Sequence, residues 1–462
     1  MHRYIMNVYT FLIRCMGGLS SHIGQKTKHT VICLAVAVLS ALGLIRPLKY
    51  SLRVTFFNYS DMVFTVTGVI ALLALMIVIA DKEADLRKVD YNRPCVYGWL
   101  LCFIMIFATS FIHPVSGEYR IWAVVSLLIS LPSVMIWAAR EDYGQYCALI
   151  AKIMTAAACV FVILNLLVVP FLRPDETPVY TGLMDNPNGN GMVVIGLYAA
   201  SLFLLLTDDR ALLPCSLVMS FCIALSYVSE CRTAELAILL ESLLGAGYCI
   251  RAAGREGKPA DVRKIILTCA AIVVIALAAS FVLRGIGKTD LNAYAEDNYK
   301  YITSDEDAPE YLKTLDLMTS RRISIWRAYI CESTFWGNGA PEEPLIKTFE
   351  ASVFAHNNAI EILYTSGVLA FAGYAVFLMS GIVFVIRCML GRYGYKKEHL
   401  LVILAFIGYF TEAMMEVLMY PVSHMPAILL NLCMMPIFIK HPRCSANDGK
   451  KLSGRGKLPA HM

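Results

Sequence analysis

Charge is scarce in this chain of 462 residues. Only 16% of its residues are Asp, Glu, Lys or Arg, whereas soluble domains carry about 25%. Apolar residues make up 58% of the sequence, and the mean hydropathy is +0.61. This balance excludes an ordinary soluble domain and predicts a protein that crosses a membrane several times.

Several patterns typical of other protein classes are also missing. The 15 cysteines include no CxxC pair, so we interpret them as small apolar residues of buried helices. No internal repeat of the kind found in duplicated transporters is present, and residues 81–94 lack the Gly-rich basic signature of major-facilitator carriers. The net charge of only +5 gives no reason to expect nucleic acid as a partner. Residues 1–28 lack a signal-peptide pattern and are expected to be a basic cytoplasmic lead-in.

Apolar stretches of about the length needed to cross a bilayer as a helix recur along the chain. They cover residues 30–47, 62–80, 95–112, 121–138, 148–169, 191–206, 211–229, 233–250, 265–283, 367–390, 400–418 and 424–439. We therefore predict an all-α polytopic membrane protein with about twelve transmembrane helices, because helices satisfy their own backbone hydrogen bonds in lipid.

The distribution of Lys and Arg predicts the orientation, since positive residues flanking spans stay on the cytoplasmic side. With both termini inside, the inner segments hold 25 of these residues and the short outer segments hold 6. The predicted regions are a basic cytoplasmic segment (1–29), nine spans (30–283), a long extracytoplasmic loop with short amphipathic helices (284–366), three spans (367–439) and a disordered cytoplasmic tail (440–462).

The long loop is acidic as a whole but locally basic. Residues 284–355 contain 8 basic and 12 acidic side chains, and Arg321, Arg322 and Arg327 lie close together in sequence. We predict one amphipathic helix over residues 318–335, with Arg322 one turn before Trp326 on the same face. The arginines and Trp326 either rest against lipid headgroups or form an anion clamp, because guanidinium groups match phosphate oxygens.

His356 begins the next predicted element, which is expected to run without a break into the tenth span. Asn357 and Glu361 are four residues apart and share one helix face. The imidazole of His356 is either a hydrogen-bonding residue at the membrane edge or a group that deprotonates or polarises a sugar hydroxyl.

Further polar residues occur at the expected outer ends of other spans. Arg232 lies in a short turn with Glu230 and Glu235, where it either serves function or forms an ion pair. Asn186 and Asn188 precede the sixth span, whose N-terminus can bind an anion or simply be capped.

Carboxylates also fall within the spans themselves. Glu412 and Glu416 are one turn apart in the eleventh span, and Glu241 lies in the eighth. Such groups share a proton, pair with a base or bond between helices, and in a transporter they are coupling sites. Glu416 lies near the outer end, where it is an alternative base.

These residues follow one another in a pattern that resembles a known family. His356-Asn357, nine residues and then Gly367 resembles the His-Asn-x9-Gly signature of the O-antigen ligase and polymerase superfamily, membrane enzymes that move glycans off polyprenyl pyrophosphate. Three further pieces occur in the family's order, and the resemblance covers roughly residues 150–440. These pieces are Asn186-Pro187-Asn188, a turn from Ser229 to Thr233 similar to Ser-x-Arg, and Arg322-x3-Trp326 followed by Gly337-x-Gly339. The chain departs from the pattern at Ala370 and in the insertion of Glu230-Cys231.

The resemblance implies a GT-C-like glycosyltransferase in which Arg232 and Arg322 bind the pyrophosphate of the donor. His356 would contact the acceptor hydroxyl or the pyrophosphate. The substrate-binding residues are expected to be Arg321, Trp326, Asn357, Glu361, Asn186, Asn188 and Glu416. Since guanidinium groups can stabilise the charge on the leaving diphosphate, we expect transfer without a metal or other cofactor. Asp305-Glu306-Asp307 is a DxD-like triplet, and a metal role for it stays open.

The expected partners are a polyprenyl-pyrophosphate-linked oligosaccharide, a glycan or lipid acceptor and membrane lipids. We expect the protein in the cytoplasmic membrane with its active site facing outside. A polysaccharide polymerase is the preferred function, because polymer assembly occurs in envelopes with and without an outer membrane. A ligase that transfers finished glycan, a polysaccharide or lipid-glycan transporter, and a non-catalytic scaffold are the alternatives.

Overall fold

The structure is a computed structural model of the whole chain. It describes residues 2–48, 60–112, 117–172, 180–184, 187–255, 262–287, 309–339, 345–346, 351–418 and 421–441. Within these residues almost every element is a helix. The one sheet is a pair of two-residue antiparallel strands, β1 (Leu345–Ile346) and β2 (Ala351–Ser352).

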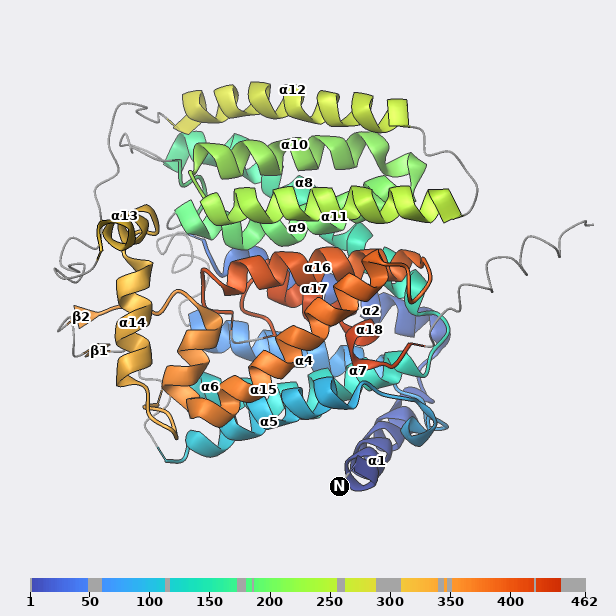
Figure 1. Cartoon of the computed structure of the whole chain (residues 1–462). Helices are drawn as coiled ribbons and strands as arrows, with labels where there is room; N and C mark the ends of the chain where they lie inside the picture. The colour runs from blue at the N-terminus through green and yellow to red at the C-terminus, as the bar shows by residue number, and fades with distance from the viewer. Residues whose placement is uncertain are drawn as a thin grey trace, which may run out of the picture.

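Long helices lie side by side and form a bundle, and one short helix crosses the ends of the others (Figure 1). The long helices are α2 (Gln25–Ile45), α4 (Ser60–Ile79), α5 (Arg93–Thr109), α8 (Tyr143–Leu172), α9 (Pro187–Thr207), α10 (Leu212–Val228), α11 (Arg232–Arg255), α12 (Val262–Gly287), α15 (Asn358–Met389) and α16 (Lys397–Ala413). Helix α1 (His2–Ser20) has 19 residues. The shorter helices are α6 (Gly117–Val125), α7 (Leu131–Ala138), α13 (Glu310–Met318), α14 (Arg322–Glu332), α17 (Met425–Cys433) and α18 (Met435–Phe438).

Eight stretches of helix in the described residues are long and apolar enough to cross a membrane. They belong to α2, α4, α8, α9, α11, α12, α15 and the rod made by α6, a π-helical turn (Ser126–Ser130) and α7. Helices α5 and α10 are apolar but shorter. The prediction of an all-α, multi-pass membrane protein is confirmed. The last apolar range, 424–439, forms the two short helices α17 and α18, and the range 400–418 extends beyond the end of α16.

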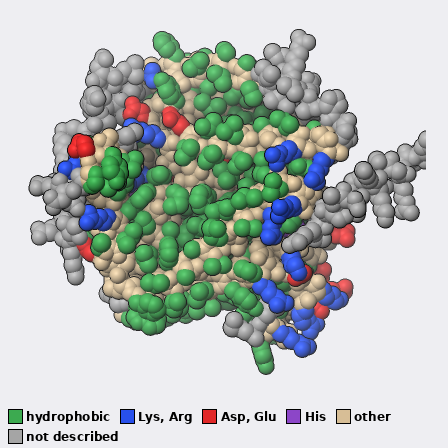
Figure 2. Space-filling model, in the orientation of Figure 1, with side chains coloured by type: hydrophobic (Ala, Val, Ile, Leu, Met, Phe, Trp, Pro, Cys, Tyr) green, Lys and Arg blue, Asp and Glu red, His purple; other side chains and the backbone are tan. Residues whose placement is uncertain are grey.

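The surface of the bundle is suited to lipid. Large apolar side chains face outward along its length, for example Leu243 on α11 and Phe281 on α12, which is 83% exposed. Figure 2 shows hydrophobic side chains over the middle of one face and charged side chains mainly near the edges where the helices end. Exposing such a surface to water would be unfavourable, whereas lipid tails are as apolar as the side chains themselves.

Close helix packing depends on small residues, as is common in membranes. Helices α5 and α15 approach so closely that a Cβ atom added at Gly373 would lie 2.5 Å from the backbone nitrogen of Cys102. The same added atom would lie 2.6 Å from the carbonyl oxygen of Gly98. This contact holds the part of α15 that follows Gly367 against α5.

The segment between α12 and α15 differs from the expected single helix over residues 318–335. The chain instead forms α13 and α14, separated by Ser320 and Arg321, whose φ angles of 51° and 64° are left-handed and end a right-handed helix. Helix α14 crosses the ends of the bundle helices (Figure 1). It packs on the strand pair and on α15 through its own small core, formed by Ile325, Ala328, Tyr329, Ile346, Val353, Ala355 and Tyr364.

Helix α15 also differs from the expectation of an unbroken run into the tenth span. Gly367 has φ 83° and ψ 179°, a conformation open essentially only to glycine, and it kinks the helix. The end of the bundle that carries this kink and α14 is called the α14 end below. Helix α1, which the sequence did not single out as a helix, lies away from it (Figure 1).

Candidate functional site

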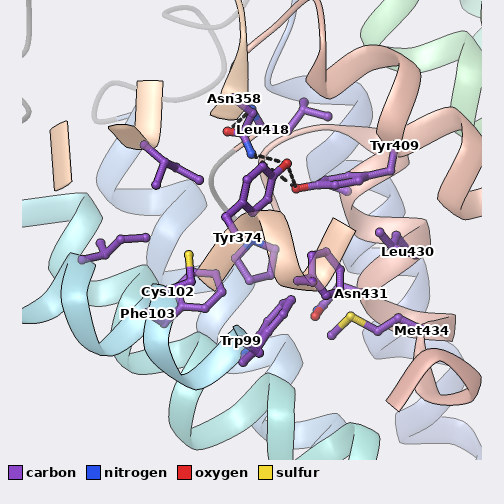
Figure 3. A pocket seen from close by; sticks show the side chains of 15 residues that line it. Trp99, Cys102, Phe103, Asn358, Tyr374, Tyr409, Leu418, Leu430, Asn431 and Met434 are labelled. Atoms are coloured by element: carbon purple, nitrogen blue, oxygen red, sulfur yellow. Dashed lines mark hydrogen bonds between the residues drawn. The ribbon is translucent and has the colours of Figure 1, made fainter. Parts of the chain in front are cut away.

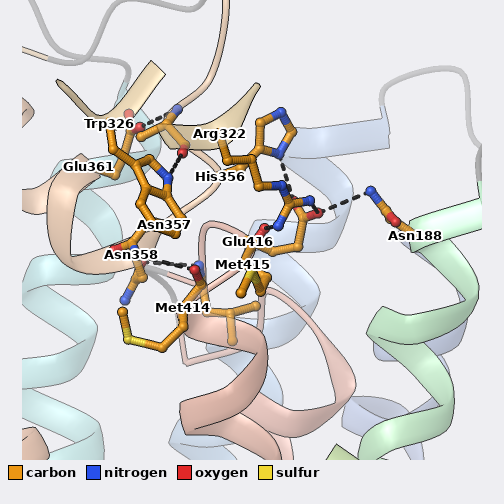
Figure 4. Close-up of polar contacts among 12 residues, drawn as sticks. Asn188, Arg322, Trp326, His356, Asn357, Asn358, Glu361, Met414, Met415 and Glu416 are labelled. Carbon is orange, nitrogen blue, oxygen red and sulfur yellow. Dashed lines mark hydrogen bonds and ion pairs between the residues drawn. The ribbon is translucent and has the colours of Figure 1, made fainter. Parts of the chain in front are cut away.

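A cluster of polar side chains at the α14 end is centred on Glu416. This residue follows α16 and is 8% exposed. Its Oε1 atom lies 3.2 Å from Nη2 of Arg322 and accepts a 3.2 Å hydrogen bond from Nδ2 of Asn188. Its Oε2 atom lies 3.0 Å from Nδ1 of His356 (Figure 4). One carboxylate therefore brings together side chains from α9, α14 and the start of α15.

Arg322 reaches this cluster because it is the first residue of α14. Its Nη1 atom donates to the carbonyl oxygen of Met415 at 2.6 Å, so the guanidinium holds both the backbone and the side chain of the segment after α16. Asp316, 2% exposed, fixes the start of α14 by accepting from the backbone nitrogen and the hydroxyl of Ser324 at 2.9 and 2.7 Å. Sequence analysis missed Asp316, since an acidic residue in an acidic loop carries no distinguishing signal.

One arginine of the predicted anion clamp, Arg322, already has a carboxylate partner within the protein. In the structure the Arg322 guanidinium is paired with Glu416, and both side chains are largely buried, with 13% and 11% exposed. Of the two alternatives, lipid headgroups or an anion clamp, neither is decided by the contacts of Arg322 and Trp326 within the protein. Arg321 precedes Arg322 and contributes its left-handed backbone to the start of α14.

Asn357 holds His356 in place. The Oδ1 atom of Asn357 caps α15 by accepting from the backbone nitrogens of Ala359 and Ile360 at 3.0 and 3.1 Å. Its Nδ2 atom donates to the carbonyl oxygen of Met414 at 3.1 Å. The Asn of the His-Asn pair therefore ties the start of α15 to the segment that carries Glu416.

Trp326 and Glu361 hold the residue before His356. The indole nitrogen of Trp326 donates to the carbonyl oxygen of Ala355 at 2.8 Å, and Oε2 of Glu361 accepts from the nitrogen of the same residue at 3.3 Å. Tyr329 donates to the carbonyl oxygen of Val353 at 2.6 Å, and burial raises the pKa of its phenol, which keeps the donor proton in place. These three side chains orient the backbone around His356.

The glycines of the sequence pattern meet one another. The loop after α14 lies against the kink of α15, where the nitrogen of Val368 donates to the carbonyl oxygen of Phe335 at 3.0 Å and the nitrogen of Gly339 to that of Thr365 at 3.0 Å. A Cβ atom at Gly367 would lie 2.3 Å from the Phe335 oxygen, and one at Gly337 would lie 2.4 Å from the Thr365 oxygen. The nine-residue spacing between Asn357 and Gly367 thus places the backbone of the kink in contact with the backbone of the loop after α14.

Backbone strain gathers near this site. Among the described residues, the non-glycine residues with positive φ are Glu230, Ser320, Arg321 and His356. All four lie in connections at the α14 end, and His356 itself has φ 49°. Each such conformation costs of order 1–3 kcal/mol and persists where surrounding contacts enforce it, which is common at functional sites.

The remaining predicted residues are placed less directly. Arg232 is exposed and begins α11, while its buried neighbour Cys231 packs on Gly191 near the start of α9. Burial raises the pKa of the Cys231 thiol to about 12, and the charges of Glu416 and Arg322 also act on it, which puts the start of α11 near the cluster. Asn186 lies outside the described residues, as does the Asp305-Glu306-Asp307 triplet.

An apolar pocket lies next to the cluster (Figure 3). Asn358 borders it and donates to the hydroxyl of Tyr374 at 2.8 Å, and that hydroxyl lies 3.0 Å from the hydroxyl of Tyr409. The other walls are mainly apolar and include Trp99, Phe103, Phe377, Leu430 and Met434. A polar cluster beside an apolar pocket suits a ligand with one charged and one apolar part. Sequence analysis missed this pocket, because its lining comes from residues 99–106, 358–377 and 409–434, which are far apart in the sequence.

No group of three or more His, Cys, Asp or Glu residues placed to hold a metal ion occurs in the described part of the chain. Comparison with known protein families, with curated proteins and with solved structures gives no match for this chain.

Proposed function

We propose that the protein is a membrane glycosyltransferase that polymerises glycan from a polyprenyl-pyrophosphate-linked donor, with its active site at the α14 end. The observation that carries the proposal is the meeting of Arg322, His356 and Asn188 on Glu416. These residues belong to separate pieces of the pattern that resembles the O-antigen ligase and polymerase superfamily. Their contacts span 60 to 228 positions of the chain, so the sequence pattern and the cluster are independent observations.

The geometry gives each residue a chemical role. With Nδ1 donating to Glu416, Nε2 of His356 is the acceptor that takes the proton from the attacking hydroxyl. The hydroxyl oxygen forms a bond to the anomeric carbon, and the bond from that carbon to the pyrophosphate breaks and leaves its electron pair on the pyrophosphate. Glu416 stabilises the imidazolium that results, as a carboxylate beside a catalytic histidine does.

The arginines act on the leaving group. Arg322 shares its guanidinium between Glu416 and the incoming pyrophosphate, and Arg232 at the start of α11 adds a second positive charge. Fixed guanidinium groups stabilise developing negative charge without reorganising during the reaction. The apolar pocket bordered by Asn358 would take an apolar part of the donor or acceptor.

The proposal includes twelve spans in the cytoplasmic membrane, with both termini cytoplasmic and the α14 end outside. Its support is the positive-inside distribution of the sequence. In Figure 2 the Lys and Arg side chains of the visible face gather mainly at the edge away from α14. One basic residue at a helix end is Arg255, in the last turn of α11, which donates to the carbonyl oxygen of Gly391 at 3.0 Å.

The test is transfer by the purified protein in lipid nanodiscs, with a polyprenyl-pyrophosphate-linked oligosaccharide as the donor. We expect His356→Ala and Arg322→Ala each to lower the transfer rate by about 10²-fold or more. Arg327→Ala is the matched control, because Arg327 is an exposed residue of the same helix. Wild-type rates in both site variants would overturn the proposal.

Glycan gels from cells carrying these variants separate the possible functions. A polymerase variant leaves single repeat units attached but never extended. Loss of a ligase instead leaves long polymer on its lipid carrier.

A proton-coupled transporter is the second candidate. Its support is the buried carboxyl pair Glu241 and Glu412, since coupling sites of transporters use such groups. Polymer that persists while lipid-linked units fail to reach the outer face would favour it.

A further inference from the structure

Two carboxyl groups lie inside the bundle, away from the cluster on Glu416. Glu241 on α11 is 0% exposed and Glu412 on α16 is 1% exposed. Neither carboxyl has a hydrogen-bond partner among the described residues. An unpaired carboxylate in such surroundings is costly, so burial favours the protonated form of each group.

The packing of α11 on α16 leaves room for one of these groups. A Cβ atom at Gly408 of α16 would lie 2.4 Å from Oε1 of Glu241, so the absence of a side chain there accommodates the carboxyl. Glu412 lies one turn beyond Gly408 on the same face of α16. Glu416 follows one turn later, with its backbone nitrogen donating to the carbonyl oxygen of Glu412 at 2.7 Å. Glu241, Glu412 and Glu416 thus form a series that leads from the bundle interior to the candidate site.

The neighbouring titratable groups supply no positive charge. Glu241 lies within electrostatic range of Glu412, of Tyr198 on α9 and of Cys222 on α10. Glu412 lies within range of Glu416 and of Cys231, which precedes α11. In the described residues neither Glu241 nor Glu412 forms an ion pair. Two protons, one on each carboxyl, are therefore what would neutralise the pair.

We propose that Glu241 and Glu412 form a proton-binding site inside the membrane whose protonation is coupled to the charge of Glu416. The site does not depend on the proposed transfer reaction. It is a place where a proton is held between two helices, one turn below the carboxylate that binds Arg322 and His356.

The test is modification of the protein in lipid nanodiscs by dicyclohexylcarbodiimide, an apolar reagent that reacts with protonated carboxyl groups. Mass spectrometry of peptides locates the adducts, and no glycan donor is needed, so the result is independent of the proposed function. We expect adducts on Glu412 or Glu241 that diminish as the pH rises. Replacing choline chloride by sodium chloride should leave the rate of labelling unchanged.

Coupling to Glu416 is tested with Glu416→Gln. The negative charge of Glu416 favours protonation of Glu412, so removing it should lower the pH midpoint of Glu412 labelling, by about one pH unit for strongly interacting groups. Gly408→Ala should reduce labelling of Glu241, whereas Gly285→Ala, which meets no other atom within 4 Å, should not.

Three outcomes of the labelling experiment would overturn the proposal. These are the absence of adducts on both residues, labelling that does not change with pH, and protection by sodium ions. The last would make the pair a cation site instead. The wild-type protein alone decides each of them, so the proposal remains testable if a variant does not fold.

Discussion

Glu412 and Glu416 are one helical turn apart, yet their carboxyl groups have opposite surroundings. Glu416 contacts Arg322, Asn188 and His356 at 3.0 to 3.2 Å. Glu412 has no hydrogen-bond partner among the described residues. Helix α16 ends at Ala413, so Glu416 faces the connecting segments at the α14 end while Glu412 stays between packed helices.

The difference shows that the position of a carboxylate relative to the end of its helix determines whether it has hydrogen-bond and ion-pair partners. Beyond the last turn, side chains at the starts of other helices can reach the carboxylate and pair with it. Inside the bundle the carboxyl of Glu412 has no hydrogen-bond partner among the described residues, and the group holds a proton in our proposal. Each prediction below changes one side of this comparison.

The largest expected effect comes from removing the charge of Glu416. Glu416→Gln keeps the shape of the side chain but leaves His356 without its stabilising carboxylate, so we expect transfer in nanodiscs to fall by roughly 10²-fold or more. Glu398→Gln, at the opposite end of α16, is the matched control. Equal rates in the two variants would contradict the role of Glu416.

Leucine at the two positions should change stability in opposite directions. Glu412→Leu removes a buried carboxyl that has no partner and should raise the thermal unfolding temperature in detergent, because such a group costs about 1–3 kcal/mol. Glu416→Leu leaves Arg322 and His356 without their carboxylate and should lower that temperature. If both variants shift the same way, the contrast between paired and unpaired carboxyls is wrong.

Much of the fold could be predicted from the sequence. Hydropathy is a local property, so the apolar ranges 30–47 and 62–80 closely match α2 and α4. The kink at Gly367 and the split between α13 and α14 escaped prediction, because both depend on contacts with distant backbone. Val368, for example, bonds to Phe335 across the kink.

The candidate site was predicted in its members but not in its arrangement. His356 and Arg322 were expected to act in catalysis and Asn188 to bind substrate, while Glu416 was expected to bind substrate or to be an alternative base. Its central place depends on contacts separated by 60, 94 and 228 positions, which no local pattern encodes. Trp326, Asn357 and Glu361 were expected to touch substrate, and in the structure their side chains form hydrogen bonds with backbone atoms of the protein.

The contact behind His356 can be tested with a pair of glycine variants. Gly367→Ala places a Cβ atom 2.3 Å from the Phe335 oxygen and strains a backbone with φ 83°, so we expect a loss of stability of about 1–3 kcal/mol and lower activity. Gly285→Ala adds the same atom where nothing lies within 4 Å and should change neither. Thermal unfolding of the two variants in detergent is the measurement, and equal unfolding temperatures would mean that the close approach of the two segments is not needed.

The smallest expected effect concerns Asn188, whose side-chain amide cannot carry a charge. Asn188→Ala removes a single 3.2 Å hydrogen bond, which is worth about 1 kcal/mol, so the transfer rate should fall by roughly fivefold. Asn188→Asp should be worse, because it places a second negative charge beside Glu416 and competes for Arg322. Rates of the two variants, measured over a range of pH, check this order. If the aspartate variant were the more active one, the Asn188 amide would not be serving as a donor to Glu416.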